Sequence, residues 1–102
     1  LAQLDDSVGQ LLTQLRECGV EENTLVVFLS DNGGPTKELT SRNTPLRGGK
    51  GELREGGIRV PFIVLGPGVK PGSVSHVPVT GLDFLPTMAE LKACRFAFLN
   101  GP

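Results

Sequence analysis

The chain has 102 residues, of which 38% are hydrophobic and 21% charged, and its formal net charge at pH 7 is −1. This is the length of one domain, and the balanced charge gives no reason to expect a nucleic-acid partner. No apolar run approaches the roughly 18 residues of a membrane span. The two cysteines, Cys18 and Cys94, are too few for a disulfide framework and lack metal-binding spacing, so we expect buried or idle thiols.

The first two thirds of the chain predict a helix and two strands. Apolar residues recur every three or four positions over residues 1–15, which predicts an amphipathic helix, and Gly19 stands where a C-terminal cap belongs. The run Thr24–Leu29 is apolar and β-branched without alternation, which predicts a strand buried on both faces, as in a parallel sheet. Phe62–Leu65 predicts a second buried strand, with Pro61 at its start.

The last third of the chain has a weaker pattern. Residues 74–79 predict either a short edge strand or an extended loop. Residues 80–93 predict a helix, in which Pro86 is compatible only with the first turn. The final stretch, "CRFAFLNGP", continues no pattern. The order of elements predicts the α/β class, with a mostly parallel or mixed sheet flanked by helices.

A long loop with many basic residues separates the two predicted strands. It runs from Gly33 to Gly57 without periodicity, and loops longer than about 12–15 residues are usually functional or disordered. The charged residues of this region are Lys37, Arg42, Arg47, Lys50, Arg54 and Arg59, against Glu38, Glu52 and Glu55. It is the one locally basic segment of an otherwise acidic chain.

Asp31 and Asn32, in the stretch "SDNGG", directly follow the first strand. Adjacent side chains converge on one ligand only where the strand ends and turns, and Gly33 and Gly34 permit such a turn. Carboxylate and amide oxygens suit Ca²⁺ or Mg²⁺, and ligands of open α/β sheets gather beyond the strand ends. The same residues also suit an ordinary turn, and two ligands are too few for a metal ion. Both interpretations remain open from the pattern alone.

Lys50 lies in "RGGKGE", where flanking glycines allow a lysine to approach a small anion. The segment is not a P-loop, because Thr44 and Gly51 stand where that motif needs glycine and Ser or Thr. A solvated basic loop is the alternative. His76 is the only histidine and lies in a loop-like connector, so we expect a surface or structural role.

Four motifs follow one another in a specific order: "SDNG" after the first strand, then "GGKG", "EGGIRVP" and "LDFLPT". Each motif is weak alone. Together they resemble the sulfatase family, and more narrowly its arylsulfatase and N-acetylgalactosamine-sulfatase branch in the alkaline-phosphatase-like superfamily. The resemblance covers about residues 1–92 and leaves residues 93–102 as a divergent tail.

The resemblance implies a partial alkaline-phosphatase-like sandwich and a site with one divalent ion, most often Ca²⁺. It implies that Asp31 and Asn32 are metal ligands, that Lys50 contacts the substrate sulfate, and that Arg59 is a structural ion-pair partner. In the family a cysteine or serine of a C/S-x-P-x-R motif becomes the formylglycine nucleophile. Family members are commonly secreted, periplasmic or lysosomal.

Two parts of the family pattern are absent from this chain. It contains no C/S-x-P-x-R motif, and His76 does not match the family's catalytic histidine. The chain also starts inside a helical pattern without an initiator methionine. We therefore expect residues 1–92 to be a C-terminal piece of a sulfatase catalytic domain, with formylglycine expected in a missing N-terminal part.

The activity expected of the parent protein is hydrolysis of a sulfate ester, for example on a sulfated sugar. We expect the chain to carry part of the metal and sulfate site and to be inactive alone. A fragment of a phosphodiesterase or phosphatase of the same superfamily and a non-catalytic remnant remain alternatives.

Overall fold

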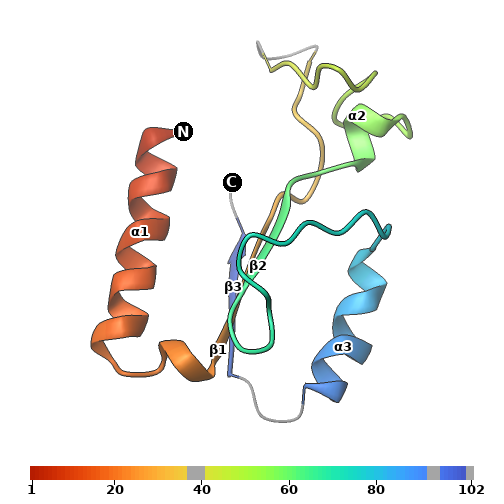
Figure 1. Cartoon of the computed structure of the whole chain (residues 1–102). Helices are drawn as coiled ribbons and strands as arrows, with labels where there is room; N and C mark the ends of the chain where they lie inside the picture. The colour runs from red at the N-terminus through yellow and green to blue at the C-terminus, as the bar shows by residue number, and fades with distance from the viewer. Residues whose placement is uncertain (37–40, 92–94, 101–102) are drawn as a thin grey trace. The chain divides into compact units, whose positions relative to one another are not determined.

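The computed structural model describes residues 1–36, 41–91 and 95–100, the last of these stretches by its backbone alone. Its elements are α1 (Ala2–Glu17), η1 (Glu21–Asn23), β1 (Thr24–Leu29), α2 (Glu55–Ile58), β2 (Phe62–Leu65), η2 (Gly81–Asp83), α3 (Phe84–Glu90) and β3 (Arg95–Asn100) (Figure 1). The chain divides into two compact units: Leu1–Val26 with Val64–Ala97, and Val27–Ile63 with Phe98–Pro102. All the candidate site residues lie in the second unit.

Helix α1 ends with the glycine cap that the sequence predicts. Gly19 has a φ of 66°, a conformation that residues with a Cβ rarely adopt. Its N–H donates to the Arg16 carbonyl (3.0 Å), and the N–H of Val20 donates to the Leu15 carbonyl (3.1 Å). These two bonds form a Schellman motif, which satisfies carbonyls left free at the helix end. The guanidinium of Arg16 then bonds Glu21 through two nitrogens, each at 3.0 Å, and this contact raises the pKa of Arg16.

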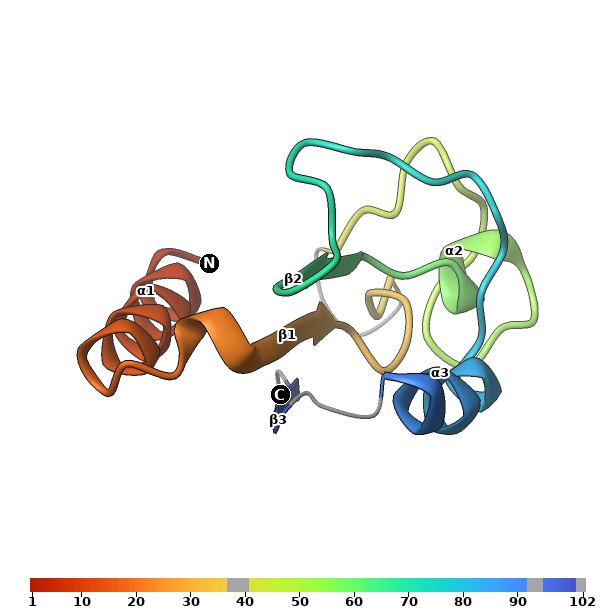
Figure 2. The ribbon, with the colours of Figure 1, turned by 60° about the horizontal axis from the view of Figure 1, so that its bottom comes forward.

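Strand β1 is buried, as predicted. It lies between β2 and β3 in the sheet (Figure 2). Leu25, Val26 and Val27 are only 3–4% exposed, because β-branched and apolar side chains pack well inside a sheet. Burial declines along the strand, and its last two residues are half-buried. The C-terminal end of β1 therefore points the chain from the core toward the surface.

The pairing of β1 with β2 is antiparallel. The N–H of Ser30, after β1, donates to the carbonyl of Pro61, before β2 (3.3 Å). Gly66, after β2, lies against the backbone of Thr24 at the start of β1. Figure 1 shows β3 running in the same direction as β1, so the sheet is mixed rather than mostly parallel.

The prediction that β2 is a buried strand was wrong. Its bounds agree with the sequence, but Phe62, Ile63 and Leu65 are 41, 58 and 38% exposed. The reason is that β2 is an edge strand, and the described residues leave much of its two faces accessible. An apolar run indicates a strand without showing what covers it.

The helix predicted over residues 80–93 is shorter and starts with a 3-10 turn. Thr80 caps η2: its N–H donates to Asp83 Oδ2 (2.6 Å), and its Oγ1 accepts the N–H of Leu82 (3.3 Å). Pro86 falls in the first turn of α3, where its missing N–H is tolerated. Residues 74–79 form an exposed loop.

Among the described residues, no helix combines the length and apolar character needed to span a membrane.

Strand β3 was not predicted. It spans Arg95–Asn100, within the stretch for which the sequence indicated no pattern. Its run "RFAFLN" is short, and the hydrogen bonds that make it a strand come from β1, which is distant in the sequence. Local pattern does not contain that pairing.

Candidate functional site

The candidate site is built on the turn that follows β1. Ser30 Oγ donates to the carbonyl of Asn32 (2.8 Å), which closes a tight turn within the "SDNGG" stretch. The N–H of Gly33 donates to the carbonyl of Gly57 (2.9 Å), which ties this turn to α2. The backbone that carries Asp31 and Asn32 is thus held at both ends.

The side chains of Asp31 and Asn32 converge, although they are adjacent in the sequence. Asn32 Nδ2 donates to Asp31 Oδ1 at 2.7 Å. Asp31 is exposed and Asn32 is half-buried. On a regular strand the two side chains would point to opposite faces, so their contact is a direct result of the turn. Two oxygen-bearing groups therefore end at one point on the surface.

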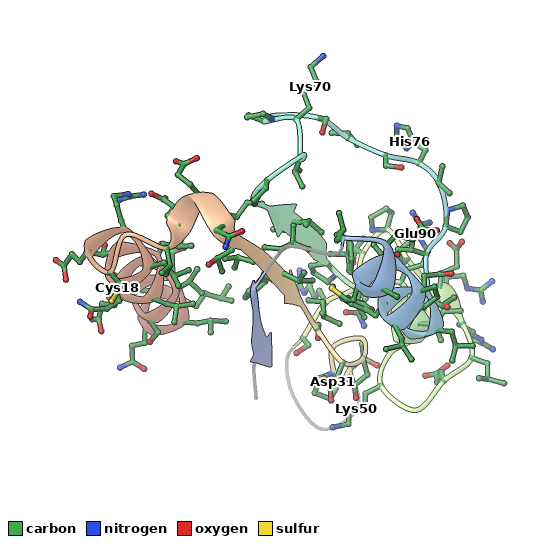
Figure 3. All side chains as sticks on the ribbon, turned by 90° about the horizontal axis from the view of Figure 1, so that it is seen from below. Cys18, Asp31, Lys50, Lys70, His76 and Glu90 are labelled. Atoms are coloured by element: carbon green, nitrogen blue, oxygen red, sulfur yellow. The ribbon has the colours of Figure 1, made fainter. Side chains whose placement is uncertain are left out.

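The loop that carries Lys50 returns to the same turn. The N–H of Lys50 donates to the carbonyl of Gly34 at 3.2 Å. In the view of Figure 3, the side chains of Asp31 and Lys50 both project at the same edge of this unit. Lys50 is exposed and forms no ion pair with the described carboxylates. The structure thus joins the backbone of Lys50 to Gly34, two residues beyond the Asp31–Asn32 pair.

Glycines make this close approach possible. Gly33, Gly49, Gly56 and Gly57 are all buried. A Cβ on Gly33 would collide with the carbonyl of Gly56, and a Cβ on Gly49 would lie 2.6 Å from the Gly34 carbonyl oxygen. The N–H of Gly56 also donates to the Arg47 carbonyl (2.8 Å). Backbone packs directly on backbone here, which only residues without side chains allow.

Asn43 is a site residue that the sequence analysis missed. Its side chain bonds the backbone of Gly34 and of Gly48, and it is half-buried. A single asparagine in a loop rich in Gly, Ser and Thr carries no distinguishing signal. Its position, nine residues beyond Gly34, becomes informative only when the loop is seen to fold back.

Two arginines of the loop, Arg47 and Arg54, line a shallow pocket. Its volume is about 580 Å³, and its lining residues are Pro45, Arg47, Leu53, Arg54 and Glu55. Arg59 Nη1 lies 3.3 Å from Glu55 Oε1, which agrees with the ion-pair role expected for Arg59. Arg54 Nε lies 3.8 Å from Glu52 Oε2. The Arg59–Glu55 pair is exposed, and such pairs contribute little to stability, whereas Glu52 in the other pair is partly covered.

The remaining candidate groups do not join this site in the part of the chain that the structure describes. Within residues 1–36 and 41–91, no three His, Cys, Asp or Glu side chains lie together in a way that could hold a metal. His76 is exposed on the loop after Lys70 (Figure 3). Cys18 is exposed, so of the two expected alternatives, a buried or an idle thiol, the buried one does not apply to it, and Cys94 lies outside the described residues.

Comparison with known proteins identifies the family. The sulfatase family model matches residues 1–92. The chain is 43% identical over 94 residues to arylsulfatase A of Homo sapiens, an alignment that covers 89% of this chain and 18% of that protein. It is 43% identical over 105 residues to a sulfatase of Formosa agariphila, covering 90% and 18%. It is 41% identical over 101 residues to steryl-sulfatase of Rattus norvegicus, covering 91% and 18%.

The chain belongs to the sulfatase family. The resemblance inferred from the order of the four motifs is thereby confirmed. The fold, a small α/β arrangement, is consistent with part of a sulfatase domain. The chain spans less than a fifth of the length of these relatives, since each alignment covers 18% of the relative.

Proposed function

We propose that this chain carries part of the metal and sulfate site of a metal-dependent sulfuric ester hydrolase. The observation that carries this proposal is that the Lys50 segment is tied to Gly34, two residues beyond the Asp31–Asn32 pair at the end of β1. These residues come from two segments, joined by the hydrogen bond from Lys50 N–H to the Gly34 carbonyl (3.2 Å). Membership of the sulfatase family supports a sulfate ester as the substrate and does not favour phosphoryl transfer.

Asp31 and Asn32 would supply oxygen ligands to a divalent cation, for which Ca²⁺ is the best candidate. Ca²⁺ takes about six to eight oxygen ligands at roughly 2.3–2.6 Å, from carboxylates and amide carbonyls. Asn32 Nδ2 lies 2.7 Å from Asp31 Oδ1, and a half-turn of the Asn32 amide would present its oxygen beside the carboxylate in place of the nitrogen, so that both residues could bind one ion. Bound there, such a cation would stabilise negative charge on the sulfate ester. The two residues fit one side of its coordination shell.

Lys50 would act on the sulfate group as a positioned positive charge. Cleavage of a sulfate ester concentrates negative charge on the sulfuryl and leaving oxygens, and a fixed ammonium stabilises that charge. Since its backbone N–H is bound to Gly34, the lysine starts from a defined position beside the strand end. Its exposed side chain is free to approach a substrate from solvent.

The isolated chain would not turn over its substrate. It lacks the C/S-x-P-x-R motif that supplies the formylglycine nucleophile in this family, and Cys18 is followed by "GVE". The test is to incubate the chain with p-nitrophenyl sulfate and Ca²⁺ and to follow nitrophenol release. We expect no release above the buffer rate. Release that depends on Ca²⁺ and is lost in Lys50→Ala would show that the chain is complete for catalysis.

A further inference from the structure

The side chain of Asn43 uses both of its amide hydrogens and its carbonyl oxygen to bind backbone. Its Oδ1 accepts the N–H of Gly34 at 3.1 Å, and its Nδ2 donates to the carbonyl of Gly34 and to that of Gly48, each at 3.0 Å. An asparagine amide offers two donors and one acceptor group, so all are engaged. The Asn43 amide therefore exchanges two hydrogen bonds with the backbone of Gly34, one accepted and one donated, as two paired strand residues do.

These three bonds join the two halves of the candidate site. Gly34 lies two residues after Asn32, and Gly48 lies two residues before Lys50. The Gly34 carbonyl also accepts the N–H of Lys50, so this oxygen accepts one hydrogen bond from Asn43 and one from Lys50. Among the described residues, Asn43 is the one side chain that bonds both backbone segments.

We propose that Asn43 is a positioning residue, whose amide fixes the spacing between the Asp31–Asn32 turn and Lys50 by bonding Gly34 and Gly48. Asn43 touches neither a metal nor a substrate in this role and acts through the backbone of the two glycines. The proposal deepens the proposed function, on which it rests. It predicts that a cation at the turn and an anion at Lys50 influence each other through this link.

The first measurement uses the unmodified chain and does not depend on function. NMR couplings across hydrogen bonds should connect Asn43 Nδ2 to the carbonyl carbons of Gly34 and Gly48. The exchange of the Lys50 amide hydrogen should be slowed. If the couplings are missing, the proposal is overturned.

The second measurement compares Asn43→Asp with Asn23→Asp. Asp has the shape of Asn but, when ionised, donates no hydrogen bond to the carbonyls of Gly34 and Gly48. Asn23 is the control position, because it is exposed and its side chain has no described partner. We expect exchange at Lys50 to rise at least about fivefold in Asn43→Asp, as for the loss of one or more hydrogen bonds. It should stay unchanged in Asn23→Asp. If Asn43→Asp unfolds α1 as well, Asn43→Ala removes the same bonds without adding charge. Unchanged exchange overturns the proposal.

The third measurement separates positioning from a purely structural role. Sulfate is titrated against the Lys50 signals with and without Ca²⁺. In the unmodified chain, Ca²⁺ should tighten sulfate binding at least about threefold, because the Asn43 link holds the two ions at a short and fixed separation, and their attraction falls as that separation grows. Asn43→Asp should bind each ion but lose this coupling, and coupling retained in that variant overturns the proposal. If the unmodified chain binds neither ion, the proposed function fails, while the exchange data still decide whether Asn43 holds the Lys50 segment.

Discussion

The backbone N–H of Lys50 donates to the carbonyl of Gly34 at 3.2 Å, which joins two segments that are 16 positions apart. Gly49, which precedes Lys50, is buried. A Cβ at Gly49 would lie 2.6 Å from the oxygen of Gly34 and 2.8 Å from Thr36 Oγ1. The position of the lysine thus depends on the absence of side chains beside it.

Replacing Gly33 with alanine should destabilise the chain. The added Cβ would collide with the carbonyl of Gly56 and lie 2.8 Å from the Cα of Gly57, so backbone would have to shift. We expect a loss of about 1–3 kcal/mol in the free energy of unfolding, measured by urea denaturation. Gly9→Ala is the matched control, because its Cβ meets nothing within 4 Å in α1. That variant should gain about 0.5–1 kcal/mol, and an equal response of the two would contradict the packing described here.

Removal of the Lys50 ammonium should slow catalysis in a full-length protein that contains this chain. Lys50→Ala should lower kcat for an aryl sulfate by more than about 10²-fold, because a charge that stabilises the transition state is lost. The measurement is steady-state hydrolysis, with kcat and KM determined separately. Lys70→Ala, which removes an exposed lysine of the other unit, should leave both constants unchanged. A Lys50→Ala enzyme with a near-normal kcat would refute the role of this residue.

Calcium should bind at the turn after β1 through Asp31. NMR titration of the chain should shift the amides of Asp31 and Asn32, and a chelator should reverse the shifts. Asp31→Asn keeps the shape but removes the charge, so it should weaken binding at least about tenfold, since ligand charge tunes Ca²⁺ affinity. Asp6→Asn, at an exposed position of α1, should bind as the unmodified chain does. Equal affinities in the two variants would argue against a metal site at this turn.

Loss of the Thr80 cap should loosen the helical segment η2–α3. Thr80→Ala removes the acceptor of the Leu82 N–H, and we expect a cost of about 0.5–2 kcal/mol in local stability. This loss of local stability is measured by amide hydrogen exchange at Leu91, whose N–H donates to the Thr87 carbonyl (3.1 Å). Thr13→Ala is the control, because Thr13 lies inside α1 and bonds only the Gly9 carbonyl (2.9 Å). If exchange at Leu91 is the same in both variants, the cap does not support the helix.

Local pattern was a good guide to the elements and a poor guide to burial. The bounds of β1 and β2 agree with the predictions, and so does the cap at Gly19. The exposure of Phe62 and the pairing of β3 were not foreseen, because both depend on which elements lie next to a strand. The three candidate site residues were identified from the order of the motifs, which can be seen in the sequence without any knowledge of contacts.

The sequence by itself determined the family, the order of helices and strands, and the residue types with site chemistry, because periodicity, caps and motifs are local properties of the chain. Only the tertiary structure decided that Asp31 and Asn32 converge, that Lys50 returns to Gly34, and that Asn43 joins the two segments. The first of these contacts is local and follows from the turn, whose hydrogen bonds the pattern alone left open. The other two depend on close packing of buried glycine backbone, which arises when distant segments fold together and which no local pattern encodes.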